Sequence, residues 1–135
     1  MKKQFSVYPT NTSDQYWKDG LYDACITLAE TYEFPIDYNR YNGIKNKNDR
    51  NMLQLTIDAS CALYDNSVTK IRFYNYKILV GHIATDESQK IYWVSDKLTV
   101  NKDFSILETK LLDYDSDIPE FAFTIEFERM EVDRK

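Results

Sequence analysis

A strict alternation of apolar and polar residues from residue 53 to residue 64 constrains the fold of this chain more than any other feature. Its apolar positions are Leu53, Leu55, Ile57, Ala59, Cys61 and Leu63. Successive side chains of a strand point to opposite faces, so this two-residue period predicts a β-strand with one buried face. The pattern returns at Phe121, Phe123, Ile125 and Phe127. We therefore expect a sheet with one apolar and one polar face.

Other parts of the chain predict further strands and the turns between them. The strands are expected at residues 3–8, 71–80, 91–100 and 106–112, with turns at 65–67 and 86–88. Strands joined by short turns pair antiparallel. The apolar phase switches between Phe73 and Tyr74, which predicts a β-bulge there. The final strand is expected to run to about Val132, with a slip near Arg129.

Residues 14–33 show the spacing of an amphipathic helix. Apolar side chains recur at steps of 4, 4, 3 and 4, at Trp17, Leu21, Cys25, Leu28 and Tyr32. Thr12 and Gln15 fit a capping box, and Pro35 ends the pattern. One helix covers only one face of a sheet. We therefore expect a single α+β domain over residues 1–135, with one N-terminal helix packed on an antiparallel sheet of about five or six strands.

This arrangement predicts the environment of the remaining positions. Cys25 and Cys61 fall on the two apolar faces and are expected to be buried, reduced thiols between helix and sheet. The open face of the sheet would carry Thr56, Asp58, Thr124, Glu126 and Glu128. The first residues lack the apolar run of a signal peptide, and no stretch reaches the roughly 18 apolar residues of a membrane span. We expect a cytoplasmic protein without membrane contact.

Negative charge is concentrated near the end of the chain. The formal net charge is −5, and residues 103–135 hold ten acids and four bases, whereas residues 1–102 are net +1. Such a field disfavours nucleic acid and favours a basic protein partner, although solubility alone would also account for it. The loop expected at 35–51 interleaves tyrosines with bases, as single-strand binders do, but its net charge is only +2. We therefore expect no nucleic-acid partner.

Residue types that carry catalytic or metal-binding chemistry are scarce. One His, two Cys and three Gly argue against a zinc framework or a Gly-rich phosphate loop. Residues 113–117 begin like a calcium loop, yet Ile118 and Thr124 stand where an EF-hand needs Gly and Glu. Glu126 and Glu128 could form a carboxylate pair on one strand face, but a solvated face gives the same pattern. We expect no enzyme activity, no metal and no cofactor.

Two short stretches resemble some contact-dependent-inhibition immunity proteins of bacteria. They are Tyr16-Trp17-Lys18 leading into Leu21 and Leu28, and Lys90-Ile91-Tyr92-Trp93-Val94 followed by Leu98. The resemblance implies a tryptophan-bearing first helix and a later strand with a Val-Tyr element before a short acidic turn. The Ser-Glu-Trp element of that family is absent here, and no binding residue is carried over.

Together these features favour a small inhibitor that neutralises a basic toxin, nuclease or defence effector, as a bacterial immunity protein or a phage anti-defence protein would. The expected partner-binding residues are Asp113, Tyr114, Asp115, Asp117, Glu126 and Glu128, with Tyr114 as the anchor. The alternative is a small-ligand-binding or catalytic domain with an aromatic pocket between helix and sheet, near Trp17, Tyr32, His82 and Trp93. A third interpretation is an assembly protein whose exposed edge strand forms homo-oligomers.

Overall fold

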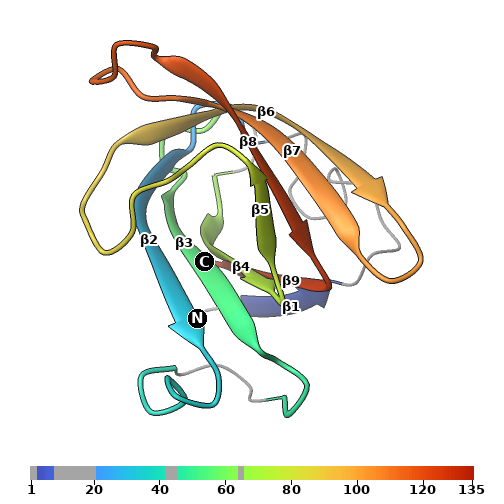
Figure 1. Cartoon of the computed structure of the whole chain (residues 1–135). Coiled ribbons are helices and arrows are strands. Elements are labelled where there is room, and N and C mark those ends of the chain that lie inside the picture. Colours follow the sequence, from blue (N-terminus) through green and yellow to red (C-terminus); the bar gives the residue numbers. More distant parts are fainter. Residues whose placement is uncertain (1–2, 8–20, 42–45, 64–65) are drawn as a thin grey trace.

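The computed structural model describes residues 3–7, 21–41, 46–63 and 66–135, and these residues form one antiparallel sheet of nine strands (Figure 1). None of the described residues lies in a helix. The strands are β1 (Lys3–Val7), β2 (Cys25–Glu33), β3 (Asn51–Asp58), β4 (Val68–Tyr74), β5 (Lys77–Val80), β6 (Ile91–Val100), β7 (Ser105–Leu112), β8 (Glu120–Phe127) and β9 (Arg129–Arg134).

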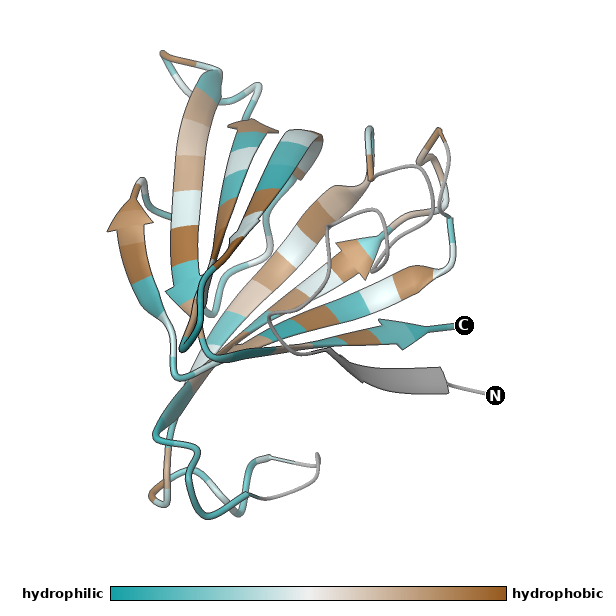
Figure 2. Cartoon of the chain, turned by 90° about the vertical axis from the view of Figure 1, so that its right-hand side faces the viewer, coloured by the Kyte–Doolittle hydropathy of each residue, from teal (hydrophilic) through white to brown (hydrophobic). Residues whose placement is uncertain are grey.

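The sheet divides into two halves that lie over each other. The strand order is β1-β9-β4-β3-β2-β6-β7-β8-β5. We call β1 to β2 in this order the first half-sheet and β6 to β5 the second half-sheet. They are joined where Cys25 and Ile26 of β2 pair with Tyr92 and Ile91 of β6, a junction that we call the seam. Figure 2 shows the two half-sheets diverging, with apolar positions alternating along their strands.

The main core lies between the two half-sheets. Leu55, Ile71 and Val132 of the first half share one buried cluster with Trp93, Leu107 and Ile125 of the second. The rings of Phe73 and Phe127 meet across this layer, with their centroids 5.2 Å apart. The period-2 pattern is confirmed within β3 and β8, because Leu53, Leu55, Ile57, Phe123, Ile125 and Phe127 are buried and Phe121 is partly buried. Their cover is the opposite half of the same sheet. The pattern does not hold beyond the end of β3 at Asp58, since Leu63 is 62% exposed.

The expected α+β fold is wrong, because the predicted helix overlaps a strand. Cys25–Glu33 forms β2, and residues 14–20 of the expected helix lie outside the described residues. A register shift between Ile26 and Leu28 marks a β-bulge in β2. The extra residue brings Cys25 and Leu28, three positions apart in the predicted helical stripe, onto the same face of β2, opposite Asp58 and Thr56 of β3. That spacing imitates a helix, and the expected sheet of five or six strands was also too small.

Two predicted irregularities are boundaries between strands. β4 ends at Tyr74 and β5 begins at Lys77, with Asn75 between them at a φ of 54°. The phase switch near Phe73 is therefore a corner and not a bulge inside one strand. The predicted slip near Arg129 is the break between β8 and β9. Each break lets the chain leave one half-sheet and enter the other.

The outer face of the first half-sheet carries a buried polar layer, made of Gln54, Arg72, Tyr74, Glu131 and Asp133. Arg72 donates from its two Nη atoms to the carboxylate of Asp133 and from Nε to Gln54 Oε1 at 3.0 Å. The Tyr74 hydroxyl donates to Glu131. Burying a charge is unfavourable unless it is paired and hydrogen-bonded. The layer therefore fixes β3, β4 and β9 relative to one another.

Candidate functional site

The acidic loop, residues 113–119, connects β7 to β8 and extends beyond the end of the sheet (Figure 1). Its shape is set by Asp113, whose backbone N–H donates to the Pro119 carbonyl at 2.7 Å. The carboxylate of Asp113 accepts from the backbone N–H of Asp115 at 3.0 Å, and its carbonyl accepts from Ser116 N at 3.2 Å. These short-range bonds are typical of Asp-initiated turns. Asp113 thus orders the loop from its half-buried position.

The rest of the acidic loop presents apolar side chains among carboxylates. Tyr114 is 71% exposed and Ile118 is 74% exposed. Asp115, Asp117 and Glu120 are exposed beside them. Large apolar side chains in the middle of a charged surface are typical of protein-binding sites, because water contact there is unfavourable until a partner covers them.

Tyr114 connects the acidic loop to the seam. Its ring meets the ring of Tyr92 edge-on, with the centroids 5.7 Å apart. Tyr92 lies on β6 and pairs with Leu112 at the end of β7 and with Cys25 of β2. The register therefore brings the loop beside the junction of the two half-sheets.

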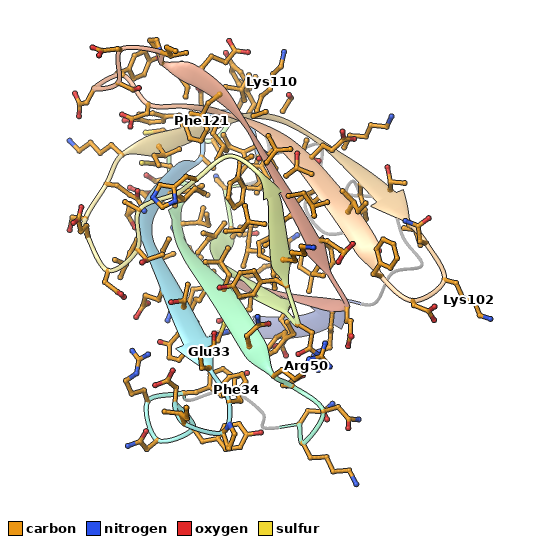
Figure 3. The ribbon with its side chains drawn as sticks, viewed as in Figure 1. Glu33, Phe34, Arg50, Lys102, Lys110 and Phe121 are labelled. Atoms are coloured by element: carbon orange, nitrogen blue, oxygen red, sulfur yellow. The ribbon has the colours of Figure 1, made fainter. Side chains whose placement is uncertain are left out.

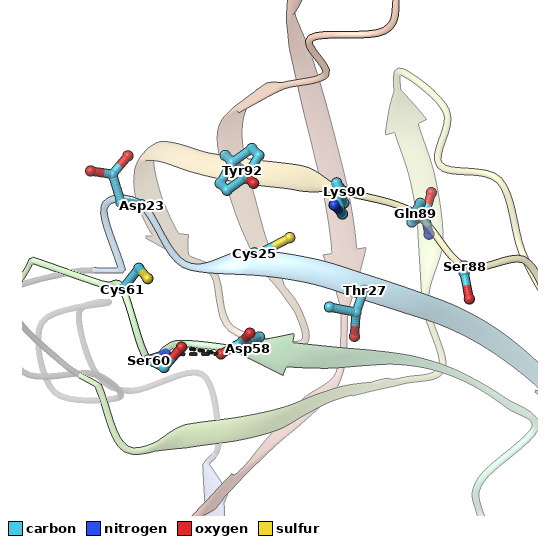
Figure 4. Close-up of a pocket in the computed structure, with 10 residues that line it drawn as sticks. All are labelled: Asp23, Cys25, Thr27, Asp58, Ser60, Cys61, Ser88, Gln89, Lys90 and Tyr92. Atoms are coloured by element: carbon cyan, nitrogen blue, oxygen red, sulfur yellow. Dashed lines mark hydrogen bonds between the residues drawn. The ribbon is translucent and has the colours of Figure 1, made fainter.

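A pocket of about 440 Å³ opens at this junction, and we call it the seam pocket (Figure 4). It lies where β2 and β3 run beside the start of β6, so its wall comes from three separate parts of the chain. Its lining residues are Asp23, Cys25, Thr27, Asp58, Ser60, Cys61, Ser88, Gln89, Lys90 and Tyr92. Two carboxylates, one ammonium, one aromatic ring and several hydroxyl, amide and thiol groups thus face one cavity.

Hydrogen bonds and burial shift the pKa values of two groups in the seam pocket, Asp58 and Cys25. The hydroxyl and the backbone N–H of Ser60 donate to Asp58 Oδ1 at 2.7 and 3.0 Å and hold the pKa of Asp58 below its ordinary value. Burial raises the pKa of the Cys25 thiol, and the charge of Asp58 raises it further. Asp58 is therefore ionised at neutral pH, and Cys25 is a neutral thiol.

Glu126 and Glu128 do not lie with the acidic loop. Strand residues rise about 3.3 Å each, so Glu128 is roughly 25 Å from the loop at the far end of β8. Figure 3 shows Lys110 and Phe121 at the loop end of the sheet and Arg50 at the opposite end. Glu128 accepts from Arg50 Nη2 at 3.3 Å and Asn75 Nδ2 at 2.8 Å, while Glu126 pairs with Lys77 in the sheet register. The loop residues Asp113, Tyr114, Asp115 and Asp117 are the ones that the fold brings together.

The two cysteines differ in exposure, which corrects the expectation that both are buried. Cys25 is buried beside the seam, whereas Cys61 is exposed. β3 ends at Asp58, so the alternation that placed Cys61 on an apolar face continues past the end of the strand. Neither cysteine belongs to the core between the two half-sheets; both contribute to the lining of the seam pocket.

The alternative aromatic pocket is not formed by the described residues. Trp93 is buried in the main core, whereas Tyr32 belongs to a separate cluster with Tyr41, Met52 and Tyr74. His82 is exposed, and Trp17 lies outside the described residues.

The described part of the chain holds no group of three or more His, Cys, Asp or Glu residues arranged to hold a metal ion. Within the same residues, no helix has the length and apolar character needed to cross a membrane. Comparisons of the chain with protein-family models, curated proteins and solved structures find no match. The resemblance to immunity proteins therefore stays a prediction.

Sequence reasoning missed the seam pocket because no local pattern marks it. Asp58 was assigned to an open polar face and Lys90 to no site. The pairing of Cys25 with Asp58 and with Tyr92 brings three distant segments together. The charge excess of residues 103–135 pointed to the neighbouring acidic loop and not to the pocket, whose lining residues all lie before residue 103.

Proposed function

We propose that this protein is a small acidic inhibitor that binds a basic protein partner through the acidic loop and the adjoining seam. The observation that carries the proposal is the exposure of Tyr114 and Ile118 among Asp115, Asp117 and Glu120. A toxin, a nuclease or a defence effector is the class of partner that such a protein would mask, as an immunity or anti-defence protein does.

The chemistry of the loop supports a protein partner over a polyanion. Carboxylates repel the phosphates of nucleic acids and anionic lipids, and they attract lysine and arginine side chains at long range. Exposed Tyr114 and Ile118 would supply the apolar contact that gives such a complex its lifetime. The hydrogen bonds that Asp113 makes within the loop reduce the ordering cost on binding.

The proposal places the protein in the cytoplasm. Cys25 and Cys61 are free thiols, which agrees with a reducing compartment. In the cytoplasm, such an inhibitor would be in the same compartment as the toxins and nucleases that act inside the cell.

Differential capture followed by binding kinetics tests the proposal. The tagged wild-type protein and a variant with Asp115→Asn, Asp117→Asn and Glu120→Gln are used to capture proteins from the source cells at low salt. A matched control carries Glu108→Gln on the exposed face of β7, so it removes charge without touching the loop. The proposal predicts a basic protein that the wild type and the control retain and that the loop variant loses.

Association and dissociation rates measured with the purified partner then separate the role of the loop charges in encounter from the role of Tyr114 in holding the complex together. The loop variant should associate severalfold more slowly at low salt and show a flatter salt dependence, because exposed charges act mainly on encounter. Tyr114→Ala should instead raise the dissociation rate, because it removes a packed aromatic contact. Wild-type kinetics for both variants, or retention of the same proteins by all three baits, would overturn the proposal.

A further inference from the structure

We propose that the seam pocket receives an arginine side chain of the partner; this inference rests on the proposed function and names the group that the site recognises. Tyr92 lines the cavity of about 440 Å³, and its ring contacts the ring of Tyr114. The cavity is therefore next to the acidic loop. A partner that covers the acidic loop therefore also covers the mouth of the pocket. A long basic side chain is the part of such a partner that reaches into it.

The charges of the pocket favour a cation. Asp58 is held ionised by two hydrogen bonds from Ser60. Asp23 adds a second carboxylate from an exposed turn, where its backbone has a φ of 70° and its N–H donates to the Trp93 carbonyl at 2.9 Å. Lys90 is the opposing charge in the lining. Among the lining residues, two carboxylates against one ammonium leave a net charge of −1 before any ligand enters, and the Lys135 ammonium acts on Asp58 from outside the lining.

The aromatic wall favours a guanidinium over an ammonium group. Tyr92 lines the pocket, and the edge-on contact with Tyr114 holds its ring. A planar guanidinium stacks on such a ring and also binds a carboxylate through two parallel hydrogen bonds, which a lysine ammonium cannot do. Gln89 adds an amide, whose Nε2 donates to the Ala84 carbonyl at 3.0 Å and whose oxygen remains as an acceptor.

The protein uses the same combination of groups inside its own fold. The guanidinium of Arg129 lies over the ring of Tyr74, 3.8 Å from its centroid. The same guanidinium donates to both carboxylate oxygens of Asp49, at 3.0 and 3.1 Å. The seam pocket has the same kinds of group in its lining, a tyrosine ring in Tyr92 and carboxylates in Asp58 and Asp23.

A defined small probe tests this inference without the partner. N-acetyl-arginine amide is titrated into the ¹⁵N-labelled protein, and amide and Gln89 side-chain shifts are followed by NMR. The neutral isostere N-acetyl-citrulline amide and the lysine analogue serve as comparison probes. We expect saturable shifts confined to the seam pocket with a Kd of about 1–10 mM, in keeping with a ligand of this size held by few contacts, and weaker binding of both comparison probes.

Three variants assign the effect to named groups. Asp23→Asn keeps the left-handed backbone, which Asn tolerates, and should weaken arginine binding roughly threefold or more by removing one charge. Lys90→Ala should strengthen binding by a similar factor, because it removes the repulsive charge. Glu108→Gln, on the outer face of the second half-sheet, should leave it unchanged. If Lys90 had only a structural role, Lys90→Ala would not increase the affinity for the arginine probe.

Citrulline binding as tight as arginine binding, shifts that never saturate, or weaker binding in Lys90→Ala would overturn the inference. These failures differ from failure of the proposed function. Loss of arginine binding with loop-dependent partner capture intact would reject only the pocket assignment. Arginine binding that persists while no partner depends on the loop would reject only the inhibitor proposal.

Discussion

Arg72 of β4 and Asp133 of β9 share two hydrogen bonds, Nη1 to Oδ1 at 2.9 Å and Nη2 to Oδ2 at 2.7 Å, with both side chains nearly inaccessible to water. Glu131 Oε1 lies 4.0 Å from the same guanidinium. Arg72→Met would therefore remove the guanidinium that faces both carboxylates in the buried layer. We expect a loss of about 3–5 kcal/mol in the free energy of unfolding, measured by urea denaturation.

An exposed ion pair provides the matched comparison for the buried one. Lys110 Nζ and Glu120 Oε1 are 3.5 Å apart with both side chains more than half exposed. Lys110→Met should change the free energy of unfolding by less than about 1 kcal/mol, because water and salt screen the pair. Equal losses for the two methionine variants would show that the polar layer is not what holds β4 to β9.

Two hydroxyls on the inner face of β7 should respond oppositely to removal. Ser105 Oγ is buried and has no hydrogen-bond partner among the described residues, whereas Thr109 Oγ1 donates to the Phe123 carbonyl at 2.7 Å. Ser105→Ala should leave the stability unchanged or raise it, since it removes an unsatisfied polar group. Thr109→Val should lower the free energy of unfolding by about 1 kcal/mol or more. Thermal and urea unfolding of the two variants measure these changes. A large loss of unfolding free energy for Ser105→Ala would contradict the prediction.

Gly81 is required where β5 leaves the sheet. Its φ is +84°, and a Cβ at this position would clash with the Ala122 carbonyl oxygen. Gly81→Ala should lower the free energy of unfolding by roughly 2 kcal/mol or more, because both the backbone conformation and the contact are unfavourable. His82→Ala, at the next and exposed position, should stay within about 0.5 kcal/mol of the wild type. A neutral Gly81→Ala would mean that β5 and β8 separate without cost.

The thiols should react with a disulfide reagent at two distinct rates. Cys61 is exposed, whereas Cys25 is buried and its pKa is raised by burial and by Asp58. Because the thiolate is the reactive form, we expect one fast and one slow thiol in the native protein. Cys61→Ser should abolish the fast phase, and Cys25→Ser should abolish the slow one. A single fast phase for both thiols would show that the seam opens freely.

Alkaline pH should destabilise the protein through its buried tyrosines. Burial raises the pKa of Tyr32, Tyr41, Tyr74 and Tyr76 above the ordinary value of 10.0. The folded state therefore holds these protons more tightly than the unfolded state does. Their contribution is fully present below pH 10.0 and is lost as the pH rises towards the folded-state pKa values. Tyr76→Phe should flatten the fall in unfolding free energy above about pH 10, while an unchanged slope would contradict this assignment.

The sequence predicted the strands that have one apolar and one polar face. Phe123 to Phe127 alternate because β8 packs one face on the core, and the structure confirms this alternation. In β3 the apolar positions Leu53, Leu55 and Ile57 are buried as predicted, but Gln54 on the opposite face is buried as well. The same rule failed where both faces are buried. In β9, Arg129, Glu131 and Asp133 alternate with Met130 and Val132, and all five are buried. From the sequence, charged residues at alternating positions predict a face exposed to solvent. These residues are buried because tertiary partners such as Arg72 make their burial favourable, and such partners cannot be recognised from the local sequence.

The site was predictable only in its local part. The acidic loop is continuous in sequence, so its charge and its tyrosine could be recognised without a structure. The seam pocket depends on the pairing of Cys25 with both Asp58 and Tyr92, and this pairing was hidden because the bulge after Ile26 made β2 imitate a helix. One inserted residue thus concealed both the fold class and the pocket.

The position of β9 between β1 and β4 has a consequence for how the chain is made. Lys3 pairs with Arg134, so neighbours in the sheet are separated by almost the whole chain. During synthesis, β4 has no partner on that side until residues 129–134 have left the ribosome. The nascent chain must therefore keep an unpaired strand edge away from other chains while nearly half of the sequence is still being added, and contacts this distant close slowly.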